Sequence, residues 1–133
     1  MVIISVRGVK PPTQGSISAF GAGIAVDTHE KRLKPYRQKI RDAYKEQGGE
    51  YFDQYVPVCL EATFYFKKPK KPKAFLPSHK GADLDKLLRA CGDGLTGVAW
   101  YDDCQVVEII GHKAFCGTEA EEGVDLEVRR VRQ

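Results

Sequence analysis

Apolar and polar residues recur along the chain with periods that predict four strands and two helices. A short β-branched run at residues 2–6 and an alternating run at residues 56–66 have the two-residue period of strands. A third strand is expected over residues 104–115, and alternation with one slip over residues 124–131 predicts a fourth.

Two segments space their apolar residues as helices do. In the first, Pro35 is expected to lie in the first turn, where the missing N–H of proline costs nothing, and Gly48 and Gly49 are expected to end the helix. Its apolar face consists of Tyr36, Ile40, Ala43 and Tyr44, and its opposite face carries Arg37, Lys39, Arg41 and Lys45. The second helix is expected over residues 83–95, with its exit at Gly97.

The order β-α-β-α-β-β predicts an α+β fold in which both helices cover one face of a mixed four-stranded sheet. The 133 residues suffice for one modest core, and no repeat or linker divides them, so residues 1–133 are expected to form a single domain. A sheet covered on one side only can leave apolar surface for a dimer interface.

Composition narrows the class of protein. Apolar residues make up 42% and charged residues 29%, as in ordinary globular proteins. The apolar runs fall far short of the roughly 20 residues of a membrane span, and the first residues do not resemble a signal peptide, so we expect a cytoplasmic protein without a membrane partner. Four cysteines without a CxxC pair indicate reduced, mostly packed thiols rather than zinc ligands.

The distribution of charge indicates more than the net charge of +3. Residues 67–80 contain six lysines and no acid, whereas residues 117–127 contain five acids and no base. A basic segment attracts phosphate by releasing counterions, although a solubilising surface loop would look the same. The candidate DNA contacts in this segment are Lys67, Lys68, Lys70, Lys71, Lys73 and Lys80.

Residues 83–103 are rich in aspartate and are the most informative segment. Asp83 and Asp85 form a DxD pair at the start of the second helix, and Asp102 and Asp103 form a DD pair just before a strand. Carboxylates from two segments suit Mg²⁺ or Mn²⁺, which can activate water for phosphodiester hydrolysis. The alternatives are that Asp83 only caps the helix, that Asp85 pairs with Arg89, and that the DD pair only makes a turn.

Helix geometry limits how the DxD pair can act. Residues two apart in a helix point about 200° apart, so Asp83 and Asp85 can share a metal only if Asp83 lies at or before the helix start. Trp100 and Tyr101 precede the DD pair. We expect both rings to pack in the core, with base stacking as the alternative.

The motif pattern resembles that of the RusA-type Holliday junction resolvases. It consists of DLDK at residues 83–86, Arg89, the step Asp93-Gly94-Leu95, an aromatic pair, and DDCQVV at residues 102–107. The resemblance covers most of the chain, and the two halves together are far more specific than either alone.

The resemblance implies a set of site residues. The family's metal-binding carboxylates correspond to Asp83, Asp85 and Asp103, and its catalytic lysine to Arg89. Arginine keeps the positive charge but is a poor proton donor, so a role as electrostatic stabiliser survives the change. The family's asparagine is Lys86 here, and we hypothesise that Lys86 contacts DNA and takes over part of the missing lysine's role.

The resemblance also implies an activity. We expect a homodimeric, Mg²⁺-dependent endonuclease, with Mn²⁺ as a possible substitute, that resolves four-way DNA junctions by paired symmetric nicks in recombination and repair. Two alternatives remain open: a branched-DNA-binding protein without catalysis, and a nuclease that prefers other branched DNA. A nucleotide-sugar transferase using the DxD pair is disfavoured, because 133 residues leave little room for two substrate sites.

Overall fold

A computed structural model describes residues 2–14, 27–71, 76–77 and 82–132 of the chain. The elements follow the order β1, α1, β2, α2, η1, β3, η2 and β4, where η1 and η2 are single 3₁₀ turns. The predicted order of strands and helices is therefore confirmed, and so is the α+β class. No helix among the described residues is long and apolar enough to cross a membrane.

The four strands form one mixed sheet in the order β1-β4-β2-β3. β2 pairs in parallel with β3, whereas β4 pairs antiparallel with both β1 and β2. A register shift near Val58 leaves Val107 as an extra residue at the start of β3. The strands span β1 Ile4–Arg7, β2 Val58–Lys67, β3 Val106–Cys116 and β4 Gly123–Arg130.

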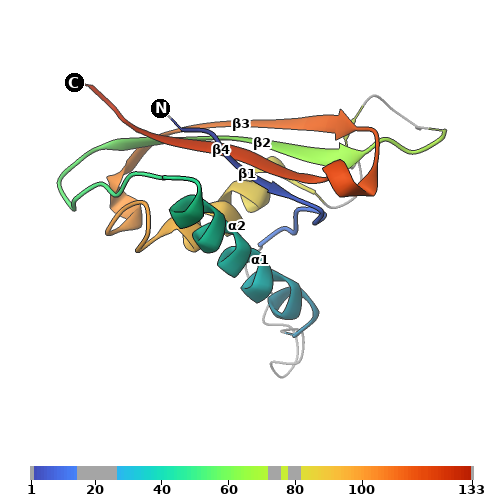
Figure 1. Cartoon of the computed structure of the whole chain (residues 1–133), viewed down its shortest axis with the longest axis horizontal. Helices are drawn as coiled ribbons and strands as arrows, with labels where there is room; N and C mark the ends of the chain where they lie inside the picture. Colours follow the sequence, from blue (N-terminus) through green and yellow to red (C-terminus); the bar gives the residue numbers. More distant parts are fainter. Residues whose placement is uncertain (1, 15–26, 72–75, 78–81, 133) are drawn as a thin grey trace.

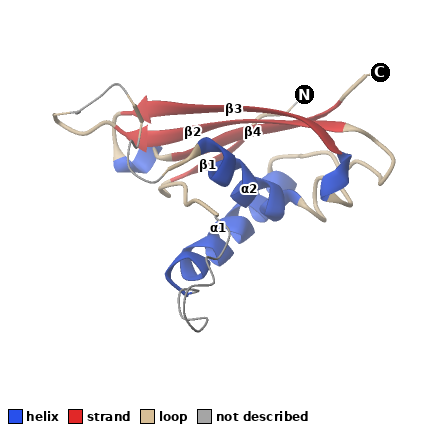
Figure 2. Ribbon diagram, turned by 180° about the vertical axis from the view of Figure 1, so that it is seen from behind, coloured by secondary structure: helices blue, strands red, loops and turns tan. Residues whose placement is uncertain are grey.

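Both helices lie on the same side of the sheet, as Figures 1 and 2 show from opposite directions. α1 (Asp27–Glu46) and α2 (Leu84–Leu95) contact each other, and α2 also contacts β2 and β3. An ideal Cβ on Gly111 of β3 would lie only 2.8 Å from Leu88 Cδ1 of α2. The helix therefore approaches β3 closely where that strand has no side chain.

The core forms between the helices and the covered face of the sheet. The alternating residues of β2 (Val58, Leu60, Ala62, Phe64 and Phe66) are all buried, as their period predicted. The apolar face of α1 is buried as well, and it extends one turn further back to Leu33, which is 3% exposed. Leu87, Cys91 and Leu95 of α2 complete the cluster.

The predicted start of the first helix was wrong. α1 begins at Asp27, two turns before Pro35, and Pro35 lies inside it. Leu33 is the one apolar residue in the sequence of residues 27–34, so an apolar stripe is barely visible in the first two turns of the helix. Leu33, three residues before Tyr36, was the available signal for an earlier start.

The face of the sheet opposite to the helices carries ion pairs. Arg7 pairs with Asp125 at 2.6 Å, and Arg129 pairs with both Glu61 at 2.9 Å and Glu127 at 2.8 Å. At the start of the edge strand β3, Val107 and Ile109 are each more than half exposed. The sheet face therefore offers mixed rather than purely apolar surface.

The cysteines are all free thiols, as expected, but only two are buried. Cys59 and Cys91 pack inside, Cys116 is partly exposed, and Cys104 is exposed in η1. The expectation of mostly packed thiols thus holds for half of them. The exposed position of Cys104 follows from the turn that carries the DD pair.

Candidate active site

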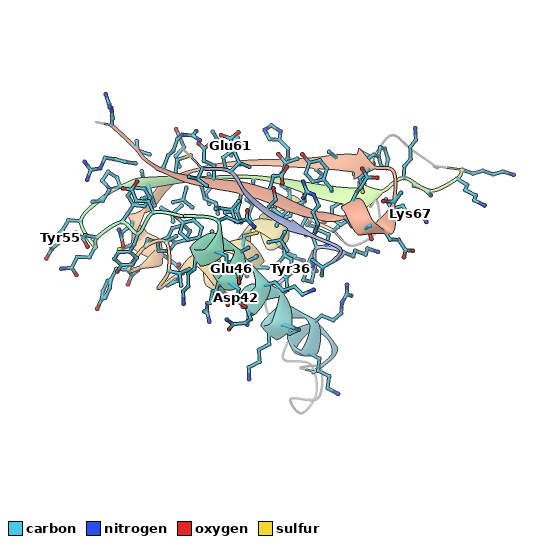
Figure 3. The ribbon with its side chains drawn as sticks, in the orientation of Figure 1. Tyr36, Asp42, Glu46, Tyr55, Glu61 and Lys67 are labelled. Carbon is cyan, nitrogen blue, oxygen red and sulfur yellow. The ribbon has the colours of Figure 1, made fainter. Side chains whose placement is uncertain are left out.

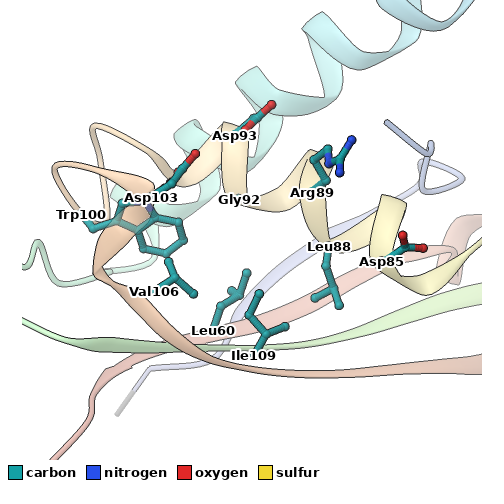
Figure 4. A pocket seen from close by; sticks show the side chains of 10 residues that line it. All are labelled: Leu60, Asp85, Leu88, Arg89, Gly92, Asp93, Trp100, Asp103, Val106 and Ile109. Carbon is teal, nitrogen blue, oxygen red and sulfur yellow. The ribbon is translucent and has the colours of Figure 1, made fainter. Parts of the chain in front are cut away.

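A cleft of about 500 Å³ opens between α2, the DD segment and the beginning of β3. Its floor is apolar and is made by Leu60, Leu88, Val106 and Ile109, while charged side chains stand along its rim (Figure 4). The charged members are Asp85, Arg89, Asp93 and Asp103. The two halves of the sequence motif, 18 residues apart in the chain, therefore contribute to one cleft.

The face of α2 explains why three of these charges line up. Asp85, Arg89 and Asp93 are spaced four residues apart, so they lie above one another on a 3.6-residue helix. The opposite face of α2 is buried against the core. Asp85 and Arg89 are both exposed, and no ion pair joins them among the described residues, so the simple surface pair is not what this structure contains.

Asp103 is fixed in place by neighbouring side chains. Its Oδ1 accepts a hydrogen bond from Thr96 Oγ1 at 2.5 Å and another from Trp100 Nε1 at 3.3 Å. Trp100 is fully buried, so its ring anchors the carboxylate from inside the fold. These contacts occupy one oxygen of an exposed carboxylate that faces the cleft.

The other residues of the DD segment have structural roles. Asp102 caps η1 by accepting a hydrogen bond from the backbone N–H of Cys104 at 3.0 Å. Gln105 is 4% exposed, and its Oε1 accepts from the backbone N–H groups of Tyr101 and Asp102. The segment therefore combines a turn residue, a cleft residue and a buried amide within four positions.

Asp93 is a cleft residue that sequence reasoning did not assign to the site. The side-chain amide of Gln14 donates to Asp93 Oδ2, and Arg37 of α1 donates to Gln14 Oε1 at 2.6 Å. The backbone N–H of Gln14 also donates to Lys86 O, which ties this segment to α2. The four-residue step from Arg89 was the signal that could have identified Asp93.

Asp83 and Lys86 lie just outside the cleft lining. Asp83 is the N-cap residue of α2, as the geometry of the DxD pair required, but its side chain makes no capping hydrogen bond. Lys86 Nζ lies 3.6 Å from Asp83 Oδ2. The two side chains therefore form an exposed pair at the entrance to α2, next to Asp85.

The described lysines of the basic segment lie at and just after the C-terminal end of β2. Lys67 Nζ is 3.9 Å from Glu119 of the acidic segment, and Lys68 lies over the ring of Phe115. Lys70 and Lys71 are exposed and have no ion pair with any described residue. Lys73 and Lys80 fall outside the described residues.

The donor chemistry of the cleft suits a hard divalent cation. Asp85, Asp93 and Asp103 supply only carboxylate oxygens, the ligands that Mg²⁺ prefers. Within the described part of the chain, no three acidic, cysteine or histidine side chains lie close enough to hold an ion together. Mg²⁺ is commonly held by one or two carboxylates together with substrate phosphates and water, so a complete protein cage is not required.

The electrostatic environment at the DD pair is negative. A hydrogen bond to the Asp102 carboxylate is the main cause that raises the pKa of the exposed Cys104 thiol, and the charge of Asp103 adds to it. The two carboxylates therefore disfavour a thiolate at Cys104.

Comparison with known families gives one assignment. The family model for endodeoxyribonuclease RusA matches residues 10–129 of the chain. A search of curated proteins found no match. The match spans the cleft residues of α2 and of the DD segment as well as the basic segment.

Proposed function

The chain belongs to the endodeoxyribonuclease RusA family, and from this premise we propose that it is a divalent-metal-dependent nuclease that resolves four-way DNA junctions by paired symmetric nicks. The observation that carries the proposal is the cleft that joins Asp85, Arg89 and Asp103 from two separate segments. The proposal extends to a role in DNA recombination and repair, with Mg²⁺ as the cofactor and Mn²⁺ as a substitute.

The carboxylates are proposed to hold two cations against the scissile phosphate. Asp85 and Asp103 line the cleft at its opposite ends, so each is proposed to ligate one of the two ions, with phosphate oxygens and water completing the shell. Asp83, directly before α2, is proposed as the third family carboxylate and would join after releasing Lys86. When bound, the metal lowers the pKa of a water molecule and neutralises charge on the phosphate.

Arg89 is proposed to stabilise the charge that develops on the phosphate. It lies between Asp85 and Asp93 on the cleft face of α2, and its guanidinium can bind two phosphate oxygens at once. Because arginine stays protonated, this role involves no proton transfer. Lys86 is proposed as a secondary phosphate contact, and junction cleavage by Lys86→Ala at the wild-type rate would contradict that part of the proposal.

DNA is proposed to bind through the basic segment as well as the cleft. Lys67, Lys68, Lys70, Lys71, Lys73 and Lys80 would contact phosphates and position the junction without reading sequence. The basic segment connects β2 to α2, and Asp85 in the first turn of α2 is the cleft residue nearest to this segment along the chain. Junction affinity should then fall steeply with salt, by about 0.9 in log K per phosphate contact.

A homodimer is part of the proposal because of the symmetry of the reaction. Resolution requires two nicks on strands of like polarity, and a two-fold dimer supplies two equivalent clefts. One cleft alone would give single nicks that are not coordinated.

The experiment that tests the proposal compares a synthetic four-way junction, a flap and a linear duplex of the same sequence in Mg²⁺. Paired nicks at symmetry-related positions of the junction, with slower cutting of the flap and none of the duplex, are expected. Faster cutting of the flap would identify a nuclease for other branched DNA. Tight junction binding without nicks in Mg²⁺ or Mn²⁺ would identify a binding protein.

A further inference from the structure

One buried side chain ties two loops together at the Asp103 end of the cleft. Gln105 Nε2 donates to the carbonyl oxygens of Asp53 at 2.6 Å and Val56 at 3.1 Å, in the loop before β2. Its Oε1 accepts from the N–H groups of Tyr101 at 2.7 Å and Asp102 at 2.9 Å, in the DD segment. The backbones of both loops are therefore held against each other by a single amide.

A second set of contacts reinforces this junction of loops. The backbone N–H of Phe52 donates to Ala99 O at 2.8 Å, and Phe52 also forms a β-bridge with Trp100. Phe52 and Trp100 are buried at 6% and 0% exposure. Their rings pack in the core and hold both loops there, so the residues next to them in sequence are fixed in position.

The rings beside these anchors are turned outward. Tyr101 is 62% exposed and Tyr55 is 88% exposed, and Tyr51 in the same loop is 46% exposed. Tyr55 projects from the end of the sheet opposite to Lys67 (Figure 3). The expectation that Tyr101 packs in the core was therefore wrong, because the buried Trp100 takes the core position and the next side chain faces solvent.

The position of these rings indicates what would cover them. Tyr101 precedes the cleft residue Asp103 by two positions, so a DNA strand whose phosphate lies beside Asp103 brings its adjoining bases to this end of the cleft. Bases in a continuous duplex stack on each other and have no free face, whereas bases at a branch point can be unstacked. Aromatic side chains bind free base faces regardless of sequence.

We propose that Tyr101 and Tyr55 form a stacking platform that binds unstacked bases at the branch point of the DNA substrate and so distinguishes branched DNA from continuous duplex. The inference rests on the proposed nuclease function and adds to it the feature of the substrate that is recognised. Phosphate contacts through lysines are available on both kinds of DNA, whereas free base faces are offered only at the branch point.

Binding in EDTA tests the platform without cleavage. The probes are a synthetic four-way junction and a linear duplex of the same sequence. Tyr101→Ala and Tyr55→Ala should each weaken junction binding by about 5- to 100-fold, as expected for the loss of one stacked base, and change duplex binding by less than about twofold. Tyr101→Phe should bind like the wild type, since the ring and not the hydroxyl stacks.

Controls separate the platform from folding and from the nuclease activity. Ile3→Ala removes an exposed apolar side chain elsewhere and should change neither affinity. Equal losses on junction and duplex, or no loss on either, would overturn the platform. If the wild type cuts junctions but the alanine variants still prefer junction over duplex as the wild type does, the platform alone is overturned. If the wild type and its variants bind as predicted here but the wild type never cuts, only the nuclease function is overturned.

Discussion

At the scale of the residue, Asp103 and its neighbour Asp102 show how position separates two chemically identical side chains. Asp103 lines the cleft and is held by Thr96 and Trp100, whereas the Asp102 carboxylate is turned to the backbone of η1. The same residue type therefore serves a cleft and a turn cap at adjacent positions. This pair provides a matched comparison for testing the metal role of Asp103.

Metal binding at Asp103 should be visible in the fluorescence of Trp100, the only tryptophan of the chain. Its indole N–H lies 3.3 Å from Asp103 Oδ1, so Mn²⁺ held by that carboxylate should quench the emission. Asp103→Asn should weaken the apparent affinity for Mn²⁺ by roughly tenfold or more, about 1.4 kcal/mol. The signal is read without DNA and without turnover.

Asp102→Asn is the control for this titration. Asparagine preserves the cap, because its side-chain oxygen can also accept from the backbone. The variant should therefore titrate like the wild type. Equal weakening by both substitutions would indicate a diffuse effect of negative charge rather than a ligand at Asp103.

At the scale of the element, the sequence predicted what depends on periodicity. β2 lies in the middle of the sheet, and its alternation of buried residues matched the expected pattern. β3 has no such alternation, and its Ile109 is 55% exposed, because an edge strand is only partly covered by the helices. Neighbour relations of this kind are tertiary and leave no trace in a single segment.

The site residues, too, fall into those that local spacing predicts and those that depend on tertiary contacts. Spacing along α2 and the DD motif indicated Asp85, Arg89 and Asp103, which the fold places in one cleft. The contact from Gln14 to Asp93, in contrast, joins residues 79 positions apart. No local pattern predicts such a contact, since it depends on how the first segment crosses α2.

The buried amide of Gln105 should be a large contributor to stability. Gln105→Leu leaves N–H groups of the DD segment and carbonyl groups of the preceding loop without partners in a buried place. Loss of such a network is expected to lower the free energy of unfolding by about 2–4 kcal/mol, measured by urea denaturation.

Gln38→Ala is a suitable comparison, because Gln38 is exposed on α1 and bonds only to Asp42 four residues on among the described contacts. Its effect should stay within about 0.5 kcal/mol. A similarly small effect of Gln105→Leu would mean that the two loops are held together by Phe52 and Trp100 alone.

At the scale of the whole molecule, core burial makes stability depend on pH on the alkaline side. Burial raises the pKa of the Cys91 thiol to about 12, and burial also raises the pKa of Tyr36, whose hydroxyl contacts it. An unfolded chain releases the cysteine proton near pH 8.5, whereas the folded protein retains it. The stability contributed by Cys91 is therefore complete below about pH 8.5 and is lost as pH rises toward 12.

Thermal or urea unfolding at successive pH values checks this prediction. The free energy of unfolding should fall by about 1 kcal/mol or more per pH unit above roughly pH 9. Cys91→Ala should lower stability overall but flatten this decline. An unchanged slope in the variant would assign the alkaline loss to other groups.

The basic residues, the cleft and the exposed tyrosines are arranged along the length of the sheet. Tyr55 and Lys67 lie at opposite ends of the sheet (Figure 3), and the exposed Lys70 and Lys71 follow Lys67 in the chain. The charged residues of α2 line the cleft. A branched substrate lying along this axis would meet phosphate contacts, the cleft and the platform in turn.

Cleavage of a synthetic four-way junction in Mg²⁺ by the wild type, Asp103→Asn and Asp102→Asn is the most direct test of the cleft as a metal-dependent active site. The wild type should make paired nicks that EDTA abolishes. Asp103→Asn should cut at least roughly 100-fold more slowly, as expected for loss of a group that organises transition-state charge, while Asp102→Asn keeps most of the activity. Nicking that survives EDTA, or that Asp103→Asn leaves intact, would contradict the account.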